Sequence, residues 1–153
     1  MGAPNIHGTA ILIGDRGLLV TGPSGSGKTT LALTLVAHFS ARGMFCRLVA
    51  DDRLFVSTHA GRLVCRAPTA IEGLAEVYGI GPQPLAFAPA AVVDLAVRLV
   101  PAGEMARFQE DAAESIAGCA VPRLDLAARD AVAAIGAVGA RLGLAPFGRY
   151  RAI

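Results

Sequence analysis

Lysine and asparagine are nearly missing from this chain of 153 residues, because each occurs only once, as Lys28 and Asn5. All of the 14 basic residues except Lys28 are arginine. Since arginine stands wherever another cation is needed, the single lysine indicates a position that requires a compact ammonium group. The Asn-Lys-x-Asp motif with which Ras-type GTPases read guanine cannot be formed from these residues. Neither an ABC-type signature nor a zinc-bearing lid is present.

Long apolar runs and paired cysteines are missing as well. Although 54% of the residues are hydrophobic, the longest uncharged run, 77–93, is interrupted by three prolines and two glycines. A spanning helix needs about 20 apolar residues, so we expect no membrane segment. Cys46, Cys65 and Cys119 form no Cys-x-x-Cys pair, which favours reduced thiols over disulfides or a zinc site. The first ten residues lack the pattern of a secretory leader, so we expect a cytoplasmic protein.

The hydrophobic pattern predicts one α/β domain over residues 1–153. Strands are expected at 6–13, 18–21, 46–50, 54–57, 63–66, 92–100 and 121–126. Helices are expected at 30–42, 69–78, 104–117 and 127–142. Strands on both sides of a helix indicate a mixed central sheet flanked by helices. The net charge of +2, without a basic run, makes nucleic acid an unfavourable partner.

Residues 22–29 read Gly-Pro-Ser-Gly-Ser-Gly-Lys-Thr, a full match to the phosphate-loop motif G-x-x-x-x-G-K-[ST]. A short apolar strand precedes the motif and an amphipathic helix follows it, which is the context that the motif requires. The glycines allow successive N–H groups to face phosphate oxygens, Lys28 reaches the terminal phosphates, and Thr29 offers a hydroxyl group to Mg²⁺. The residues expected to bind the nucleotide are Gly22, Pro23, Ser24, Gly25, Ser26, Gly27, Lys28, Thr29 and Thr30.

Asp51 and Asp52 come directly after the strand expected at 46–50. A right-handed crossover through helix 30–42 makes this strand parallel to strand 18–21 in the same sheet. The two carboxylates then lie at the sheet edge that carries the phosphate loop. One can lie near Mg²⁺ and the other near the hydroxyl group that accepts the phosphoryl group. A solvated turn between two strands is the alternative interpretation.

Four segments together resemble the catalytic domain of HPr kinase/phosphorylase, a bacterial enzyme that phosphorylates a serine of the phosphocarrier HPr. They are His7-Gly8, the phosphate loop, RLVADDR at 47–53 and GLAEVYGIG at 73–81. The resemblance implies a P-loop kinase domain of the phosphoenolpyruvate carboxykinase-like type, ATP with Mg²⁺, and an HPr-like partner protein. It also implies phosphorolytic dephosphorylation in the reverse direction. Family members usually carry a separate N-terminal domain, so the resemblance implies a short form with the catalytic domain alone.

The resemblance also assigns roles to single residues. Asp52 matches the family's proton acceptor, His7 matches an active-site histidine, and Glu76 matches a second Mg²⁺ ligand. Arg129 matches an arginine of the family's C-terminal Pro-Gly-Arg-Asn segment. The expected catalytic residues are therefore His7, Lys28, Asp51, Asp52 and Arg129. The expected metal ligands are Thr29, Asp51 and Glu76.

The chain departs from the family pattern at Tyr78 and Pro82, where the family usually has arginine and isoleucine. Tyrosine cannot supply the cationic fork that arginine offers to phosphate. Two other functions stay open from the residues alone. One is a small-molecule kinase, in which the Gly- and Pro-rich stretch 79–89 gates a metabolite pocket. The other is a regulatory module that senses ATP without turnover and contacts a two-component regulator. A homo-oligomer is also left open.

Overall fold

The computed structural model describes residues 4–148, so the two ends of the expected domain 1–153 lie outside the described residues. Residues 1–3, which belong to the N-terminal segment in which no secretory leader is expected, also lie outside the described residues. The helices are α1 (Lys28–Ser40) and α2 (Ala131–Leu142), with short 3-10 turns η1 (Thr69–Ile71) and η2 (Ala102–Glu104). The strands are β1 (Asn5–His7), β2 (Thr9–Ile13), β3 (Arg16–Thr21), β4 (Cys46–Ala50), β5 (Arg53–His59), β6 (Arg62–Arg66), β7 (Leu74–Val77), β8 (Gly81–Pro84), β9 (Ala91–Val100), β10 (Ala112–Ile116) and β11 (Cys119–Ala127).

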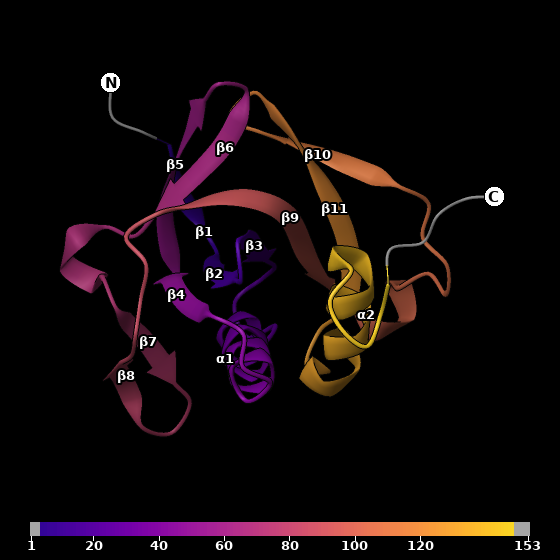
Figure 1. Cartoon of the computed structure of the whole chain (residues 1–153), viewed down its shortest axis with the longest axis horizontal. Helices are drawn as coiled ribbons and strands as arrows, with labels where there is room; N and C mark the ends of the chain where they lie inside the picture. The colour runs from indigo at the N-terminus through magenta and orange to yellow at the C-terminus, as the bar shows by residue number, and fades with distance from the viewer. Residues whose placement is uncertain (1–3, 149–153) are drawn as a thin grey trace.

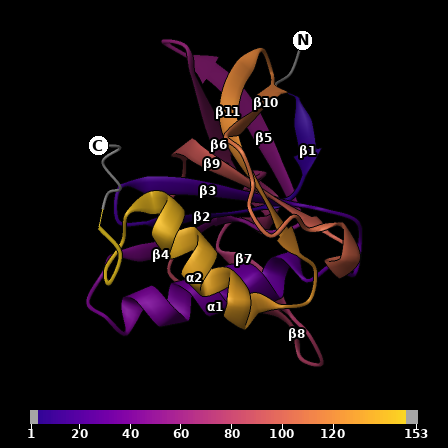
Figure 2. The same cartoon turned by 90° about the vertical axis from the view of Figure 1, so that its right-hand side faces the viewer.

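Nine strands form one mixed sheet, with the order β1-β5-β6-β9-β3-β2-β4 and with β11 and β10 added beside β9. Strand β9 runs parallel to both β3 and β11, whereas the other neighbouring strands are antiparallel. Helices α1 and α2 lie on the same side of β2, β3 and β4, while β5, β6, β10 and β11 rise on the other side (Figures 1 and 2). The mixed α/β sheet is therefore confirmed.

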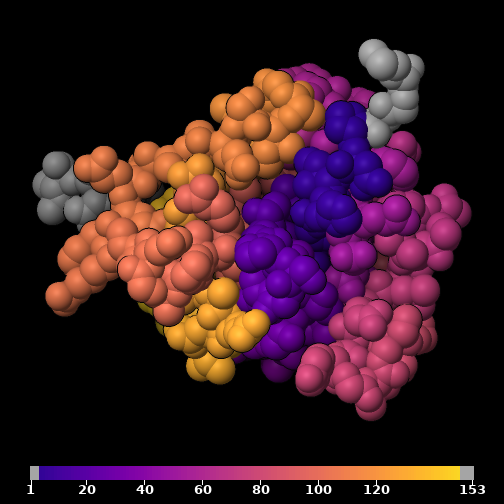
Figure 3. Space-filling model, turned by 180° about the vertical axis from the view of Figure 1, so that it is seen from behind, coloured from indigo at the N-terminus to yellow at the C-terminus, as the bar shows by residue number. Residues whose placement is uncertain are grey.

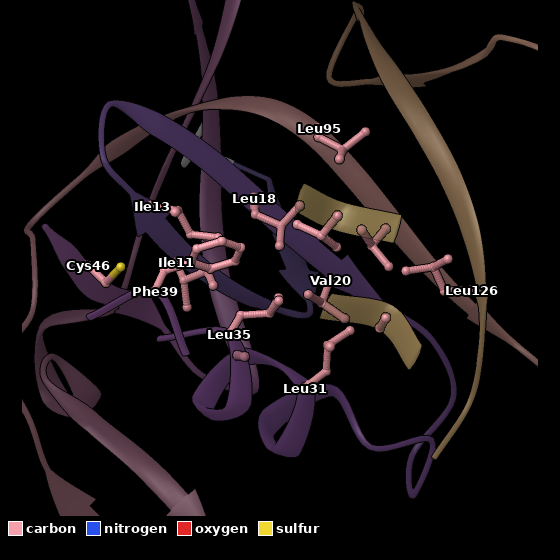
Figure 4. Packing of buried hydrophobic residues seen from close by; sticks show 14 of the residues in the cluster. Ile11, Ile13, Leu18, Val20, Leu31, Leu35, Phe39, Cys46, Leu95 and Leu126 are labelled. Carbon is pink, nitrogen blue, oxygen red and sulfur yellow. The ribbon is translucent and has the colours of Figure 1, made fainter. Parts of the chain in front are cut away.

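The core has two layers because side chains alternate between the faces of each strand. Leu18 and Val20 of β3 point toward the helices, where they join Leu31 and Leu35 of α1 in the first cluster (Figure 4). Leu19, between them in the sequence, belongs to the second cluster, which the curled part of the sheet encloses. The curled sheet thus covers the face that the helices leave open.

The strand expected at 6–13 is two strands. Strand β1 pairs with β5, whereas β2 pairs with β3 and β4, and Gly8 lies between them. The backbone N–H of Gly8 donates to the carbonyl of Asp52 at 3.0 Å, so the change of partner occurs beside the end of β4. A continuous apolar pattern does not reveal such a change of partner, because both strands keep a buried face.

Two expected helices are wrong. Residues 69–78 form η1 and then β7, which pairs with β8 in a separate hairpin. Residues 104–117 end in β10, which pairs with β11. The side chain of Gln109 donates to the carbonyl of Asp125 and accepts from its N–H, so this segment is bound to β11 before β10 begins. Tertiary pairing overrides the helical composition in both segments.

Several other predictions are confirmed with shifted boundaries. Helix α1 begins two residues earlier than expected, at Lys28, and α2 begins at Ala131 rather than at 127, because Asp130 caps it by accepting from the N–H of Ala133. Strands β5 and β6 form the expected hairpin. Strands β3 and β4 run in the same direction as predicted, but they are not neighbours, because β2 lies antiparallel between them. Within the described residues, no helix is long and apolar enough to cross a membrane.

Candidate active site

The phosphate loop connects β3 to α1 and has the backbone conformation that its glycines make possible. Gly27 caps α1 with a φ of 94°, in the left-handed region. Gly22 has a φ of 151°, and a Cβ atom there would lie 2.8 Å from Oγ of Ser26. A side chain at Gly22 would therefore force the loop open. The free N–H groups of the first turn of α1 make this end of the helix favourable for anions.

Lys28 is the first residue of α1, and its side chain turns back over the loop. Its ammonium group donates to the carbonyl of Gly22 at 2.9 Å and to that of Pro23 at 3.1 Å. An ammonium group has three donors, so one is left for a ligand. The cation is therefore held above the start of the loop, where it can bind a phosphate oxygen.

Asp51 is buried, with only 4% of the residue exposed, and its carboxylate connects three elements. Its Oδ1 accepts hydrogen bonds from the hydroxyl groups of Thr29, at 2.7 Å, and Thr9, at 2.9 Å. Its Oδ2 accepts from the backbone N–H of Glu76 at 2.8 Å. A buried carboxylate is stable only when its oxygens are well bonded, and these three donors meet that condition. Asp51 thus fixes the position of Thr29 at the start of α1.

Asp52 differs from its neighbour in both exposure and backbone. It is exposed, and its φ is 71°, a left-handed conformation that non-glycine residues seldom adopt. Among the described residues, its carboxylate has no hydrogen bond and no ion pair, whereas its carbonyl accepts from Gly8. Such backbone conformations often occur at functional sites, where they direct a side chain toward a ligand.

A large cleft of about 1040 Å³ contains most of the expected site residues. The hairpin formed by β7 and β8 makes one of its walls, and Tyr78 at the tip of this hairpin is 98% exposed. Seen from behind, the residues near position 80 form a projection beside the indigo and purple surface of the N-terminal part (Figure 3). The expected site residues that line the cleft are His7, Gly22, Ser24, Gly25, Gly27, Lys28, Thr29, Thr30, Asp51, Asp52 and Glu76.

Three expected site residues do not line this cleft. Pro23 offers the loop carbonyl that Lys28 binds, and Ser26 is buried, with an Oγ atom that has no hydrogen-bond partner. Arg129 lies on the other side of the loop, just before α2. Its N–H donates to the carbonyl of Ser26 at 3.1 Å, and its Nε donates to the carbonyl of Gly25 at 2.9 Å. In this structure Arg129 therefore holds the loop backbone.

The oxygen atoms of Thr29 and Asp51, at the end of the loop, are of the kind that binds Mg²⁺. The hydroxyl of Thr29 and the carboxylate of Asp51 are hard oxygen ligands, and the fourth acceptor position of Asp51 is not used by the three donors. No group of three histidine, cysteine or acidic side chains among residues 4–148 is placed to hold a metal. Mg²⁺ usually binds through one or two carboxylates together with substrate phosphates.

Sequence reasoning missed Thr9 and Arg53. Thr9 is 1% exposed and donates to Asp51 across a separation of 42 residues, and no local pattern announces such a contact. Arg53 lines the cleft beside Asp52, and its place directly after the two aspartates was an available signal. Glu76 was expected on a helix, but it lies on β7.

Comparison with known proteins identifies similar sequences and a similar fold. The family model for the HPr Serine kinase C-terminal domain matches residues 3–84. HPr kinase/phosphorylase of Clostridium beijerinckii is 38% identical over 76 residues, which are 50% of this chain and 23% of that protein. The protein of the same name from Halalkalibacterium halodurans is 43% identical over 77 residues, again 50% of this chain and 23% of that protein. The chain thus spans about a quarter of the length of these relatives.

A solved structure with a similar fold is the HPr(Ser) kinase/phosphatase from Coxiella burnetii. Its TM-score is 0.76, and the match covers 91% of this chain and 97% of that one at 24% sequence identity. The structural match covers 91% of the chain and therefore extends beyond residues 3–84, which the family model matches. At this sequence identity the match establishes the fold alone.

Proposed function

The chain belongs to the HPr serine kinase C-terminal domain family, and from this premise we propose that it is an ATP-dependent kinase that phosphorylates a serine of an HPr-like phosphocarrier protein. The observation that carries the proposal is the free carboxylate of Asp52, which lines the same cleft as Lys28 and Thr29. A phosphate cradle alone would only hold a nucleotide. An exposed acid beside the cradle can also act on an incoming hydroxyl group.

The loop and the first turn of α1 bind the triphosphate of ATP. Backbone N–H groups and the ammonium of Lys28 surround the phosphate oxygens and balance their negative charge. Arg129 keeps the loop in this shape, because it donates hydrogen bonds to the carbonyl groups of Gly25 and Ser26. Positioning and charge neutralisation supply most of the rate in phosphoryl transfer, so a preformed loop matters more than covalent participation by the protein.

Asp51 and Asp52 have different tasks in this proposal. Asp51 is a positioning residue, because its carboxylate is buried and holds the hydroxyl of Thr29. Thr29 and Asp51, with Glu76 at the same cleft, would hold Mg²⁺, and the ion would neutralise charge on the phosphates when it is bound. Asp52 is the catalytic base, because its carboxylate is exposed to the space from which an acceptor enters.

In the forward reaction the seryl oxygen of the acceptor attacks the γ-phosphorus of ATP. The new oxygen–phosphorus bond forms while the bond to the β,γ-bridging oxygen breaks, which releases ADP. Asp52 takes the proton of the seryl hydroxyl. In the phosphorolytic direction, an oxygen of inorganic phosphate attacks the phosphorus of the phosphoserine while the bond between that phosphorus and the seryl oxygen breaks. Asp52 gives its proton to the seryl oxygen, and pyrophosphate is released. His7 lines the same cleft and is proposed to contact the phosphates.

We place this reaction in the cytoplasm, and the three free, buried cysteines support that proposal because reduced thiols are typical of the cytosol. A homo-oligomer and a two-component regulator stay predictions.

The proposal is tested by incubating the chain with Mg²⁺, labelled ATP and a purified HPr-like phosphocarrier protein, followed by mass-spectrometric mapping of the product. We expect label on one serine of the phosphocarrier and none on a carrier whose serine is replaced by alanine. Arg42→Ala, an exposed change at the far end of α1 from the loop, serves as a matched control and keeps the activity. ATP binding without any label on the phosphocarrier would contradict the proposal.

A further inference from the structure

A second, smaller cavity lies on the other side of the phosphate loop, between the start of α1 and the start of α2. Its volume is about 220 Å³. The ends of β9 and β11 form its base, so it lies at the carboxyl end of parallel strands, where α/β proteins bind their ligands. Most of its lining is apolar: Leu31, Leu99, Ala127, Ala131 and Ala134.

The second cavity is continuous with the phosphate loop. Gly27 and Thr30 line both this cavity and the large cleft. These two residues flank Lys28 and Thr29, which line the large cleft but not the second cavity. A chain of phosphates that follows the first turn of α1 therefore has one end in the large cleft and the other end directed toward the second cavity.

The direction of the triphosphate follows from the need to admit an acceptor. The γ-phosphate must lie in the large cleft, because Asp52 lies there and an acceptor protein needs open space. The α-phosphate then points toward Thr30 and the second cavity. If the base also lay in the large cleft, it would occupy the entrance that the acceptor needs.

We propose that the second cavity receives the nucleoside half of the bound triphosphate, with its purine base between α1 and α2. The proposal rests on the proposed function for the position of the phosphates. Drug-sized ligands usually occupy pockets of about 300–1,000 Å³, so a cavity smaller than this fits a flat ring system rather than a whole nucleotide. Leu31 and Leu99 provide apolar surface, and the base is held mainly by being removed from water.

The polar groups of the cavity are largely engaged in supporting the loop and helix. Oδ1 of Asp130 caps α2 by accepting from the N–H of Ala133, and Nε of Arg129 donates to Gly25. Both residues line the cavity, and Arg129 is bonded to the loop. This arrangement places the polar ribose next to the phosphates and the base deeper, against the alkyl side chains.

The test compares ATP with inorganic triphosphate, which has the phosphates but no nucleoside. Binding of each to the full chain is measured by calorimetry in the presence of Mg²⁺, without an acceptor protein. We expect Ala134→Leu and Ala131→Leu, which fill the cavity, to weaken ATP binding by about tenfold or more. Inorganic triphosphate should bind equally well to both variants and to the wild type. Ala133→Leu is the matched control, because Ala133 is exposed on the same helix and lies outside the cavity.

Ala134 is buried in the core, so its variant can fold poorly, whereas Ala131 is half-buried and tolerates a larger side chain. Unchanged triphosphate binding shows that the loop is intact in either variant. Unchanged ATP binding in Ala131→Leu would overturn the inference. A loss of ATP binding in Tyr78→Ala alone would also overturn it, because it would place the base in the large cleft. If neither ligand bound the wild type, the phosphate site and both proposals would fail. A chain that binds as expected but transfers no phosphoryl group would contradict the proposed function alone.

Discussion

The two sides of the phosphate loop differ in chemistry, size and access. The acceptor side, defined as Asp51, Asp52 and Glu76, lines an open cleft of about 1040 Å³. The nucleoside side, defined as Leu99 and Ala131, belongs to an apolar cavity of about 220 Å³. The acceptor side contains side chains whose protons and charges can take part in a reaction. The nucleoside side can only hold a ligand by removing its apolar surface from water. In the proposed arrangement, one loop separates the phosphate that reacts from the nucleoside, which only has to be held.

The largest expected effect comes from Lys28, whose ammonium group is held above the phosphate loop between the two sides. Lys28→Ala removes the cation above the loop and should lower phosphoryl transfer by on the order of 10³-fold. It should weaken the binding of ATP and of inorganic triphosphate together, because both ligands use the same phosphates. Lys28→Arg should not restore activity, since a planar guanidinium group cannot replace the compact ammonium group. Transfer kinetics and calorimetry check this, and a variant with full activity would show that the loop does not hold the reacting phosphate.

A smaller effect is expected from the buried hydrogen bonds of the acceptor side. Thr9→Val keeps the shape of the side chain but removes one of the three donors to the carboxylate of Asp51. We expect the free energy of unfolding to fall by about 1.5–3 kcal/mol, the usual contribution of a hydrogen bond to a charged group. Thr9→Ser retains the hydroxyl group and serves as the control. Chemical denaturation measures both variants, and a Thr9→Val protein as stable as the wild type would show that this contact contributes nothing.

The smallest expected effect at neutral pH concerns Cys65, which belongs to neither side of the loop, and it is an effect on stability. Burial raises the pKa of the Cys65 thiol from its ordinary value of 9.0 to about 12. The unfolded chain then loses this proton at a lower pH than the folded chain, so stability is unaffected below pH 9 and falls as the pH rises toward 12. The decrease should be about 1.4 kcal/mol per pH unit in this range. Cys65→Ala should remove this alkaline slope and leave ATP binding unchanged, and denaturation curves at several pH values test it.

The acceptor side could largely be predicted from the sequence because its residues follow local signals. The phosphate-loop motif and the Asp51-Asp52 pair are each contiguous, and α1 has a clear apolar stripe. The contact between Thr9 and Asp51 could not be predicted, since it joins residues 42 positions apart. Glu76 was expected in the site and lines the cleft, whereas its strand was not predicted. Leu74–Val77 is fixed by pairing with Gly81–Pro84 rather than by local propensity.

The nucleoside side could hardly be predicted, because leucine and alanine at helix and strand ends look the same whether they line a cavity or fill a core. The segment 104–117 shows the same limit for secondary structure. Its composition favours a helix, but β10 forms because Ala112–Ile116 finds β11 and because Gln109 binds the backbone of Asp125. Contacts of this kind depend on the whole fold, and a local pattern does not contain them.

The most direct test of the central claim is Asp52→Asn, measured for ATP binding and for phosphoryl transfer on the same preparation. The change keeps the size of the side chain and removes its ability to accept a proton. We expect ATP affinity to stay close to that of the wild type, whereas transfer to the phosphocarrier falls by about 10²–10³-fold. Asp15→Asn, at a side chain that is 98% exposed in the turn before β3, is the matched control. Transfer that persists at the wild-type rate in Asp52→Asn would contradict the claim that the acceptor side supplies the base.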